Sequence, residues 1–123
     1  MLVLIADDSH TMRLLIRHAL HSIEGAEVIE AKDGADALAK LTEVKPDVIV
    51  TDLNMPVMDG FALIEQVRAR PELAHIPVVV LTTAGAIPES QRVRPAALLT
   101  YVTKPIRPDT LVEAVRAAAA SRR

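Results

Sequence analysis

The fold of this chain is decided by the stretch Thr51-Asp52-Leu53-Asn54-Met55-Pro56-Val57-Met58-Asp59-Gly60, which directly follows the apolar run Val48-Ile49-Val50. An uninterrupted apolar run is typical of a strand that is buried on both faces. The Pro, Asn, Asp and Gly residues that come next indicate that the strand ends there. Asp52 therefore lies at the carboxyl end of a buried strand, where open α/β sheets carry their ligands and their chemistry. The competing interpretation is a carboxylate that only caps a strand end.

The rest of the chain alternates between apolar strand patterns and amphipathic helix patterns. Strands are predicted at residues 2–6, 26–30, 47–51, 77–82 and 100–103. Helices are predicted from the N-cap Ser9 to Glu24-Gly25, from Asp33 to Lys45-Pro46, from Asp59 or Gly60 to the residue before Pro71, and from Asp109 to Ala120. Strands and helices that alternate in this way predict a parallel sheet covered by helices on both faces.

Each predicted helix has one apolar face, spaced as an amphipathic helix requires. The residues expected to face the core are Met12, Leu15, Ile16, Ala19, Leu20 and Ile23 in the first helix, Ala37, Leu38 and Leu41 in the second, Phe61, Ile64 and Val67 in the third, and Leu111, Ala114, Val115 and Ala118 in the last. His18 and His21 of the first helix are expected to face solvent.

The segment between Ala84 and Leu99 is the least regular part of the sequence. Pro88 suits the first turn of a helix, and Glu89 suits the positive end of the helix dipole. Pro95 does not suit a helix interior, because it lacks an N–H group and its ring clashes with the carbonyl four residues earlier. We therefore predict a fourth helix that is short or broken near Pro95.

Length and composition limit the classes of function. The 123 residues suit one domain with one core, so we expect residues 1–123 to form a single domain. A net charge of -2 gives no sign of a nucleic-acid or membrane surface. The absence of cysteine excludes disulfides, thiolate metal sites and a cysteine nucleophile. No apolar run is long enough for a signal peptide or a membrane span, and we expect a cytoplasmic protein.

Four predicted strands end in polar residues, namely Asp7-Asp8, Asp52, Thr82 and Lys104. A parallel sheet brings these groups to one edge. Three carboxylates close together raise one another's pKa values unless a cation lies among them, and Mg²⁺ suits such oxygen ligands. The ammonium of Lys104 and the hydroxyl of Thr82 would complete a receptor for a phosphoryl group, with Asp52 as the nucleophile. Taken singly, each residue also has an ordinary structural explanation, such as a helix start or a solvated lysine.

The pattern resembles the response-regulator receiver domain of the CheY-like superfamily over essentially the whole chain. The residues that carry the resemblance are Asp7-Asp8, the stretch 52–60, Thr82, Tyr101 and Lys104-Pro105. The segment from Asp7 to Arg13 is further similar to single-domain regulators of the chemotaxis type. The resemblance implies a flavodoxin-like, doubly wound sheet of five parallel strands in the order 2-1-3-4-5, with five helices.

The resemblance also implies roles for the acidic residues. Asp52 is then the phosphoacceptor, which receives its phosphoryl group from a histidine kinase, a histidine phosphotransfer protein or a small phosphodonor. Asp8, Asp52 and the backbone carbonyl of Asn54 would bind Mg²⁺ directly, while Asp7 would act largely through water. Such a domain is not an enzyme towards other molecules, because it catalyses only its own phosphorylation and dephosphorylation.

The resemblance assigns the switch to three further residues. Thr82 and Lys104 would contact the phosphoryl oxygens, and Tyr101 would turn inward when Thr82 moves. The alternative for Tyr101 is an ordinary tyrosine at the edge of the core. Phosphorylation would then change the surface of the fourth helix, fifth strand and fifth helix, where an unidentified protein partner binds.

The sequence departs from the family pattern at Thr83 and at Pro95 with Leu98-Leu99-Thr100, where many relatives have a continuous helix and a Gly-Ala turn. Thr83 stands where the family mostly carries Ala or Gly, and we expect it to slow phosphorylation and dephosphorylation by narrowing the access of the phosphodonor or the attacking water to the site.

Two rival functions are less well supported. A phosphatase of the haloacid-dehalogenase type uses similar groups, but Asp52-Leu53-Asn54 lacks the second aspartate of that family. A receiver fold that binds partners without phosphorylation is the other rival, and the complete acceptor site argues against it. Nucleotide binding is disfavoured because neither a Walker A loop nor a GxGxxG stretch is present.

Overall fold

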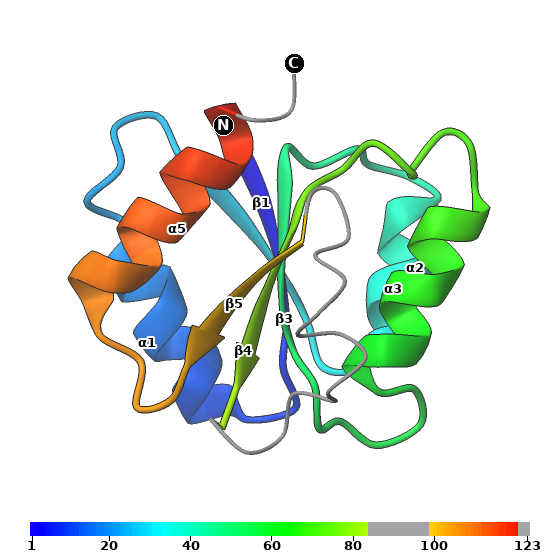
Figure 1. The fold of residues 1–123 in the computed structure, drawn as a ribbon, viewed down its shortest axis with the longest axis horizontal. Coiled ribbons are helices and arrows are strands. Elements are labelled where there is room, and N and C mark those ends of the chain that lie inside the picture. The colour runs from blue at the N-terminus through cyan, green and yellow to red at the C-terminus, as the bar shows by residue number, and fades with distance from the viewer. Residues whose placement is uncertain (84–98, 121–123) are drawn as a thin grey trace.

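The computed structural model describes residues 1–83 and 99–120, which contain five strands and four helices (Figure 1). The elements are β1 (Leu2–Ala6), α1 (His10–Leu20), β2 (Glu27–Ala31), α2 (Gly34–Leu41), β3 (Val48–Asp52), α3 (Gly60–Ala69), β4 (Val78–Thr82), β5 (Leu99–Thr103) and α5 (Pro108–Ala120). The predicted fourth helix and its break near Pro95 fall between residues 84 and 98, outside the described residues. None of the described helices is long and apolar enough to span a membrane.

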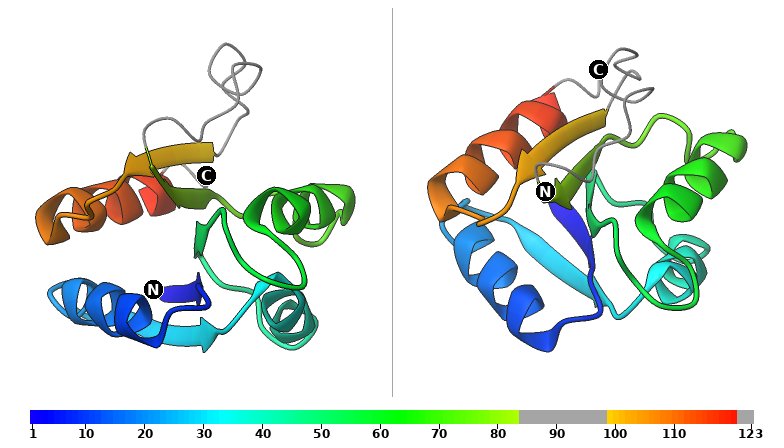
Figure 2. Two further views of the ribbon diagram at one scale, coloured as in Figure 1. Left: turned by 90° about the horizontal axis from the view of Figure 1, so that it is seen from below. Right: turned by 60° about the horizontal axis from the view of Figure 1, so that its bottom comes forward.

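The five strands form one parallel sheet in the order β2-β1-β3-β4-β5, which confirms the predicted topology. Helices α1 and α5 cover one face of the sheet, and α2 and α3 cover the other (Figures 1 and 2). The arrowheads of β4 and β5 in Figure 1 show that the carboxyl ends of the strands meet at one edge. The polar residues at the strand ends are therefore brought together, as the sequence predicts.

The central strands are buried on both faces, and their side chains alternate between two apolar clusters. Every residue of β3 and β4 is buried. The strand residues beneath α1 and α5 are Val3, Ile5, Val48, Val50, Val79, Leu81 and Val102. The strand residues beneath α2 and α3 are Leu4, Ala6, Ala31, Ile49, Val78 and Val80. Because no position in the middle of these strands faces water, polar chemistry is confined to their ends.

Helices α1, α2 and α3 each begin at a side-chain cap, and all three of their predicted starts are confirmed. Ser9, Asp33 and Asp59 each accept a hydrogen bond from the backbone N–H three residues later. Of the two alternatives for the third helix, Asp59 is the cap and Gly60 is the first helical residue. Each observed strand boundary lies within one residue of its predicted position.

The extent of α1 and part of its buried face differ from the prediction. The helix ends at Leu20, and Ser22 and Ile23 continue as a tighter turn by donating to the carbonyls three residues earlier. Ile23 is nevertheless buried, as predicted. Leu15 was predicted to face the core and is 41% exposed. At 100° per residue it lies about 40° beyond Ala19, outside the buried stripe that Ile16, Ala19 and Leu20 form.

Helices α2 and α3 also depart slightly from the prediction. Helix α2 ends at Leu41, where the hydroxyl of Thr42 donates to the carbonyl of Ala39 and the last turn is capped before Lys45-Pro46 is reached. In α3, Leu63 is 1% exposed and is more deeply buried than the predicted Phe61 and Ile64. The prediction placed Phe61 and Ile64 in the core because they are strongly apolar, and it therefore missed Leu63.

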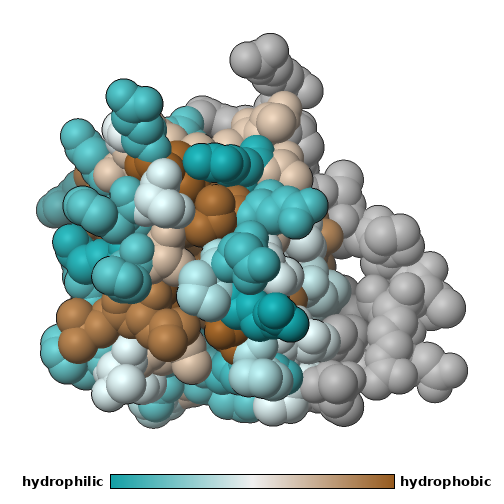
Figure 3. Space-filling model, turned by 90° about the vertical axis from the view of Figure 1, so that its left-hand side faces the viewer, coloured by the Kyte–Doolittle hydropathy of each residue, from teal (hydrophilic) through white to brown (hydrophobic). Residues whose placement is uncertain are grey.

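The outer face of α1 and α5 carries apolar patches among hydrophilic side chains (Figure 3). A groove between the two helices is lined by residues that include Ala19, Ser22, Val112 and Ala117. His18 lines the same groove, and both His18 and His21 are exposed, as the sequence predicts.

Candidate functional site

The candidate site lies at the carboxyl edge of the sheet. Four strands end there, and each is followed by or ends in one polar residue or one pair of polar residues. Asp7 and Asp8 follow β1, Asp52 is the last residue of β3, Thr82 is the last residue of β4, and Lys104 follows β5. The register aligns Asp52 with Leu81 and Thr82 with Thr103, so these strands end at nearly the same level. The backbone N–H of Lys104 donates to the carbonyl of Thr82 at 2.7 Å and extends this alignment by one residue.

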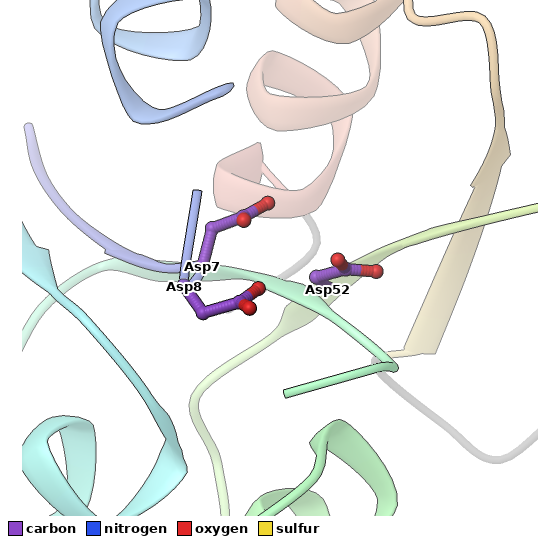
Figure 4. A group of neighbouring side chains, drawn as sticks. All are labelled: Asp7, Asp8 and Asp52. Carbon is purple, nitrogen blue, oxygen red and sulfur yellow. The ribbon is translucent and has the colours of Figure 1, made fainter. Parts of the chain in front are cut away.

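Three carboxylates form the acidic centre of the site. Asp7 and Asp8 stand next to each other after β1, with Asp52 beside them on β3 (Figure 4). One oxygen from each residue lies within 4.8 Å of the other two. Asp7 is 1% exposed and Asp52 is 6% exposed, whereas Asp8 is open to solvent. The predicted grouping of these three residues is therefore present in the structure.

The charge on Asp7 is poorly compensated. Its Oδ1 accepts a hydrogen bond from the backbone N–H of Ser9 at 2.8 Å, but its buried Oδ2 has no hydrogen-bond partner among the described residues. Burial raises the pKa of Asp7, and although the N–H of Ser9 opposes this shift, the negative charge of Asp52 adds to it. A buried carboxylate oxygen without a partner is unfavourable, and a cation would satisfy it.

The donor set of the site fits a divalent cation with hard-ligand preferences. Mg²⁺ prefers oxygen ligands and usually binds to one or two carboxylates while it keeps several waters. The three aspartates supply such oxygens, and the exposed Asp8 leaves room for water. Asn54 lies close by, because its backbone N–H donates to Asp52 Oδ1 at 3.4 Å, and its side chain is exposed.

Lys104 supplies the positive charge of the site. Its Nζ lies 3.3 Å from Asp52 Oδ2, and the side chains are 27% and 8% exposed, respectively. The Lys104-Pro105 peptide bond is cis. Thr82 is 1% exposed, and its hydroxyl donates to the carbonyl of Thr83 at 3.2 Å. Asp52 therefore has an ammonium group on one side, while the hydroxyl of Thr82 is engaged with its neighbour on the chain.

The loop between β3 and α3 is anchored close to Asp52. The backbone N–H of Gly60 donates to the carbonyl of Leu53 at 2.9 Å, and a Cβ atom at position 60 would overlap the carbonyl oxygen of Asp52. Glycine is therefore required at this position. At the other side of the loop, the N–H of Gly34 donates to the carbonyl of Met58 at 3.1 Å.

Tyr101 lies on β5 in register with Val80, on the strand next to that of Thr82. It packs against the apolar cluster beneath α2 and α3. Its hydroxyl is buried and has no hydrogen-bond partner among the described residues, and burial raises its pKa. A tyrosine with an unpaired hydroxyl at the core edge is not held in place by a polar contact.

The sequence analysis assigned no role to Arg13, but the structure places it against the acidic loop. Its Nη1 donates to the backbone carbonyl of Asp7 at 2.6 Å, and its Nε donates to Glu30 on β2 at 3.0 Å. The sequence carries no local signal for the pair of Arg13 and Glu30, because these residues are seventeen positions apart and meet only through the packing of α1 on the sheet.

Comparisons with known proteins agree with this geometry. Residues 3–116 match the family described as the response regulator receiver domain. The chain is 37% identical over 114 residues to the chemotaxis protein CheY1 of Helicobacter pylori, covering 92% of each chain. It is also 37% identical to the chemotaxis protein CheY homolog of Campylobacter jejuni, covering 92% of this chain and 88% of the relative.

Solved structures show the same similarity. The chemotaxis response regulator CheY4 of Vibrio cholerae superimposes with a TM-score of 0.83 at 36% identity, over 95% of this chain and 97% of the other. The signal receiver domain of a signal transduction histidine kinase from Syntrophus aciditrophicus gives a TM-score of 0.82 at 30% identity, over 97% and 89%. Both structures thus cover nearly the whole of this chain.

The raised pKa of Asp7 predicts that this residue destabilises the metal-free protein at neutral pH. Its contribution to stability is complete below the ordinary aspartate pKa of 3.8 and is lost as the pH rises through the raised value. Asp7→Asn should therefore raise the melting temperature at neutral pH in the presence of a chelator, and this gain should shrink as the pH is lowered. Thermal unfolding followed by circular dichroism measures both effects.

The control for this variant is Glu43→Gln, which removes one exposed negative charge away from the site. We expect it to leave the melting temperature nearly unchanged. An Asp7→Asn protein that is less stable than the wild type at neutral pH would show that Asp7 is not electrostatically strained.

Proposed function

The chain belongs to the response regulator receiver domain family, and we propose that it acts in two-component signalling by accepting a phosphoryl group on Asp52. The observation that carries this proposal is the position of Asp52 at the end of a fully buried strand. There it lies 3.3 Å from the ammonium of Lys104 and within 4.8 Å of two further carboxylates. This arrangement leaves one carboxylate paired with a fixed positive charge and next to a group that can bind a cation.

We propose that Asp52 acts as the nucleophile towards phosphorus. A carboxylate oxygen of Asp52 forms the new P–O bond while the bond between phosphorus and the donor breaks. The donor is a phosphohistidine of a histidine kinase or phosphotransfer protein, or a small acyl phosphate, and its leaving group departs with the electron pair. Lys104 stabilises negative charge on the transferred group, since phosphoryl transfer depends mainly on positioning and electrostatics.

The proposed cofactor is Mg²⁺, held by Asp8, Asp52 and the backbone carbonyl of Asn54, with Asp7 acting largely through water. When bound, it would neutralise charge on the phosphoryl oxygens. The unpartnered Oδ2 of Asp7 supports a cation in this place, and the hydrogen bond from Asn54 N–H to Asp52 supports the closeness of Asn54. The remaining charge on the acidic centre would then be balanced by Lys104.

We propose that phosphorylation is read out through Thr82 and Tyr101. The hydroxyl of Thr82 would leave the carbonyl of Thr83 and donate to a phosphoryl oxygen, which is a charged and stronger acceptor. Tyr101, whose hydroxyl is already buried, would then pack further inward, because no hydrogen-bond partner among the described residues holds this hydroxyl. The surface around β5 and α5 would shift in population between two states and recruit a protein target.

The proposal is tested by treating the wild type and Asp52→Asn with acetyl phosphate and Mg²⁺ and measuring intact masses after an acid quench. We expect one added phosphoryl group on the wild type and none on Asp52→Asn. Chelation of Mg²⁺ should abolish the adduct. Lys104→Met should bind Mg²⁺ but form little adduct, because the charge that stabilises the transferred group is lost.

The same experiment separates the rival functions. A wild-type protein that binds Mg²⁺ but never forms the adduct, even with a histidine kinase as donor, would favour a binding module that works without phosphorylation. Turnover of a generic phosphomonoester would favour a phosphatase, and we expect none. An adduct on Asp52→Asn would show that Asp52 is not the acceptor.

We further propose that Thr83 limits the rates at this site. Its side chain is exposed beside Thr82, at the position where a donor or an attacking water would enter. Thr83→Ala should therefore raise the rates of phosphorylation and dephosphorylation several-fold, as measured by the time course of the mass adduct. Thr103→Ala is the matched control, since Thr103 is an exposed threonine aligned with Thr82 on β5. Unchanged rates in Thr83→Ala would contradict the proposal.

A further inference from the structure

The backbone on both sides of the Asp7 Cα atom is held from outside the acidic centre. The backbone N–H of Asp7 donates to the carbonyl of Ala31 on β2 at 3.1 Å. Its carbonyl accepts a hydrogen bond from Arg13 Nη1 at 2.6 Å. Asp7 lies one residue beyond β1, so the second contact comes from a side chain and is not part of the sheet.

Arg13 is itself oriented by an ion pair on β2. Its Nε lies 3.0 Å from Glu30 Oε1, and its side chain is only 15% exposed. Arg17, one turn further along α1, lies 3.0 Å from the other carboxylate oxygen of Glu30 and is 51% exposed. Partial burial acts to raise the pKa of Glu30, but the hydrogen bonds from Arg17 and Arg13 outweigh it and lower the pKa. Glu30 is therefore ionised and connects both arginines to the strand beside Asp7.

The geometry of this contact affects both neighbouring carboxylates. A peptide group is planar, so a hydrogen bond to the carbonyl of Asp7 also orients the amide of Asp8. The plane sets the directions in which the side chains of Asp7 and Asp8 leave the backbone. Removal of the bond would allow this plane to rotate, and the separation of the two carboxylates would no longer be fixed.

We propose that Arg13, oriented by Glu30, is a positioning residue that sets the geometry of the Asp7-Asp8 pair for a divalent cation. This inference rests on the cation site of the proposed function. Arg13 acts through the backbone of Asp7 and is not itself a ligand. Glu30 has a second effect, because it neutralises a guanidinium that would otherwise repel a cation bound to the neighbouring carboxylates.

The chain offers a matched control in Arg17. Arg13 and Arg17 lie on the same helix, carry the same charge and pair with the same carboxylate, but only Arg13 contacts Asp7. A purely structural role in holding α1 to β2 predicts similar consequences for both substitutions. A positioning role predicts that they differ in cation affinity.

The test measures Mg²⁺ affinity by isothermal titration calorimetry and stability by thermal unfolding in a chelator. Arg13→Ala should weaken Mg²⁺ binding roughly tenfold, the lower end of the effect seen when the outer partners of metal ligands are removed. Arg17→Ala should leave the affinity unchanged, although both variants lose some thermal stability. Arg13→Lys should recover part of the affinity, because an ammonium can donate to Asp7 but does not reproduce the planar fork of arginine.

The outcomes separate this inference from the proposed function. If the wild type binds Mg²⁺ and Arg13→Ala binds it equally well, Arg13 does not position the acidic pair and only this inference is wrong. Equal losses of Mg²⁺ affinity in Arg13→Ala and Arg17→Ala would also overturn this inference. The loss would then come from the removal of a positive charge or from the packing of α1, which both variants share. If the wild type binds no Mg²⁺, both the cation site and this inference are wrong. If Arg13→Ala does not fold, Arg13→Lys and Arg17→Ala still decide the question.

Discussion

The constraint on which the rest of this structure depends is the burial of β3 and β4 on both faces of the sheet, with β1 buried almost as fully. Such strands are apolar along most of their length, so ionisable groups appear only where a strand ends. The parallel topology brings those ends to one edge. The acidic pair after β1, Asp52 and Thr82 are thus neighbours because the core leaves no other place for polar groups.

This concentration of charge has an electrostatic cost that explains the chemistry. One carboxylate oxygen of Asp7 is buried with no hydrogen-bond partner in the described part of the chain, and the ammonium of Lys104 lies against Asp52 instead. The acidic centre is therefore prepared for a cation, while Asp52 is paired with a fixed positive charge. Gly60 allows the loop after β3 to close on the backbone of Asp52. Of these features, the ammonium of Lys104 would lower the cost of placing a doubly charged phosphoryl group on Asp52, as the proposed function requires.

Much of this could be predicted from the sequence because the deciding signals are local. Apolar runs indicated the strands, caps such as Asp33 indicated the helix starts, and the strand order followed from the family resemblance. What was missed depends on tertiary packing. Leu15 is exposed because it lies beyond the edge of the buried stripe of its helix. No local sequence pattern connects Arg13 with Glu30. Val57 adopts a positive φ of 69° although it is β-branched, a conformation imposed by the loop between β3 and α3 and not by the preference of the residue.

The central claim is that this geometry singles out one of three neighbouring carboxylates as the acceptor. The most direct measurement treats the phosphorylated protein with borohydride, which reduces an acyl phosphate to an alcohol and releases phosphate, and then maps the peptides by mass spectrometry. The account predicts homoserine at position 52 and unmodified aspartate at positions 7 and 8. Homoserine at position 7 or 8, or a mixture of positions, would contradict it, since the pairing of Asp52 with Lys104 would then not decide which carboxylate reacts.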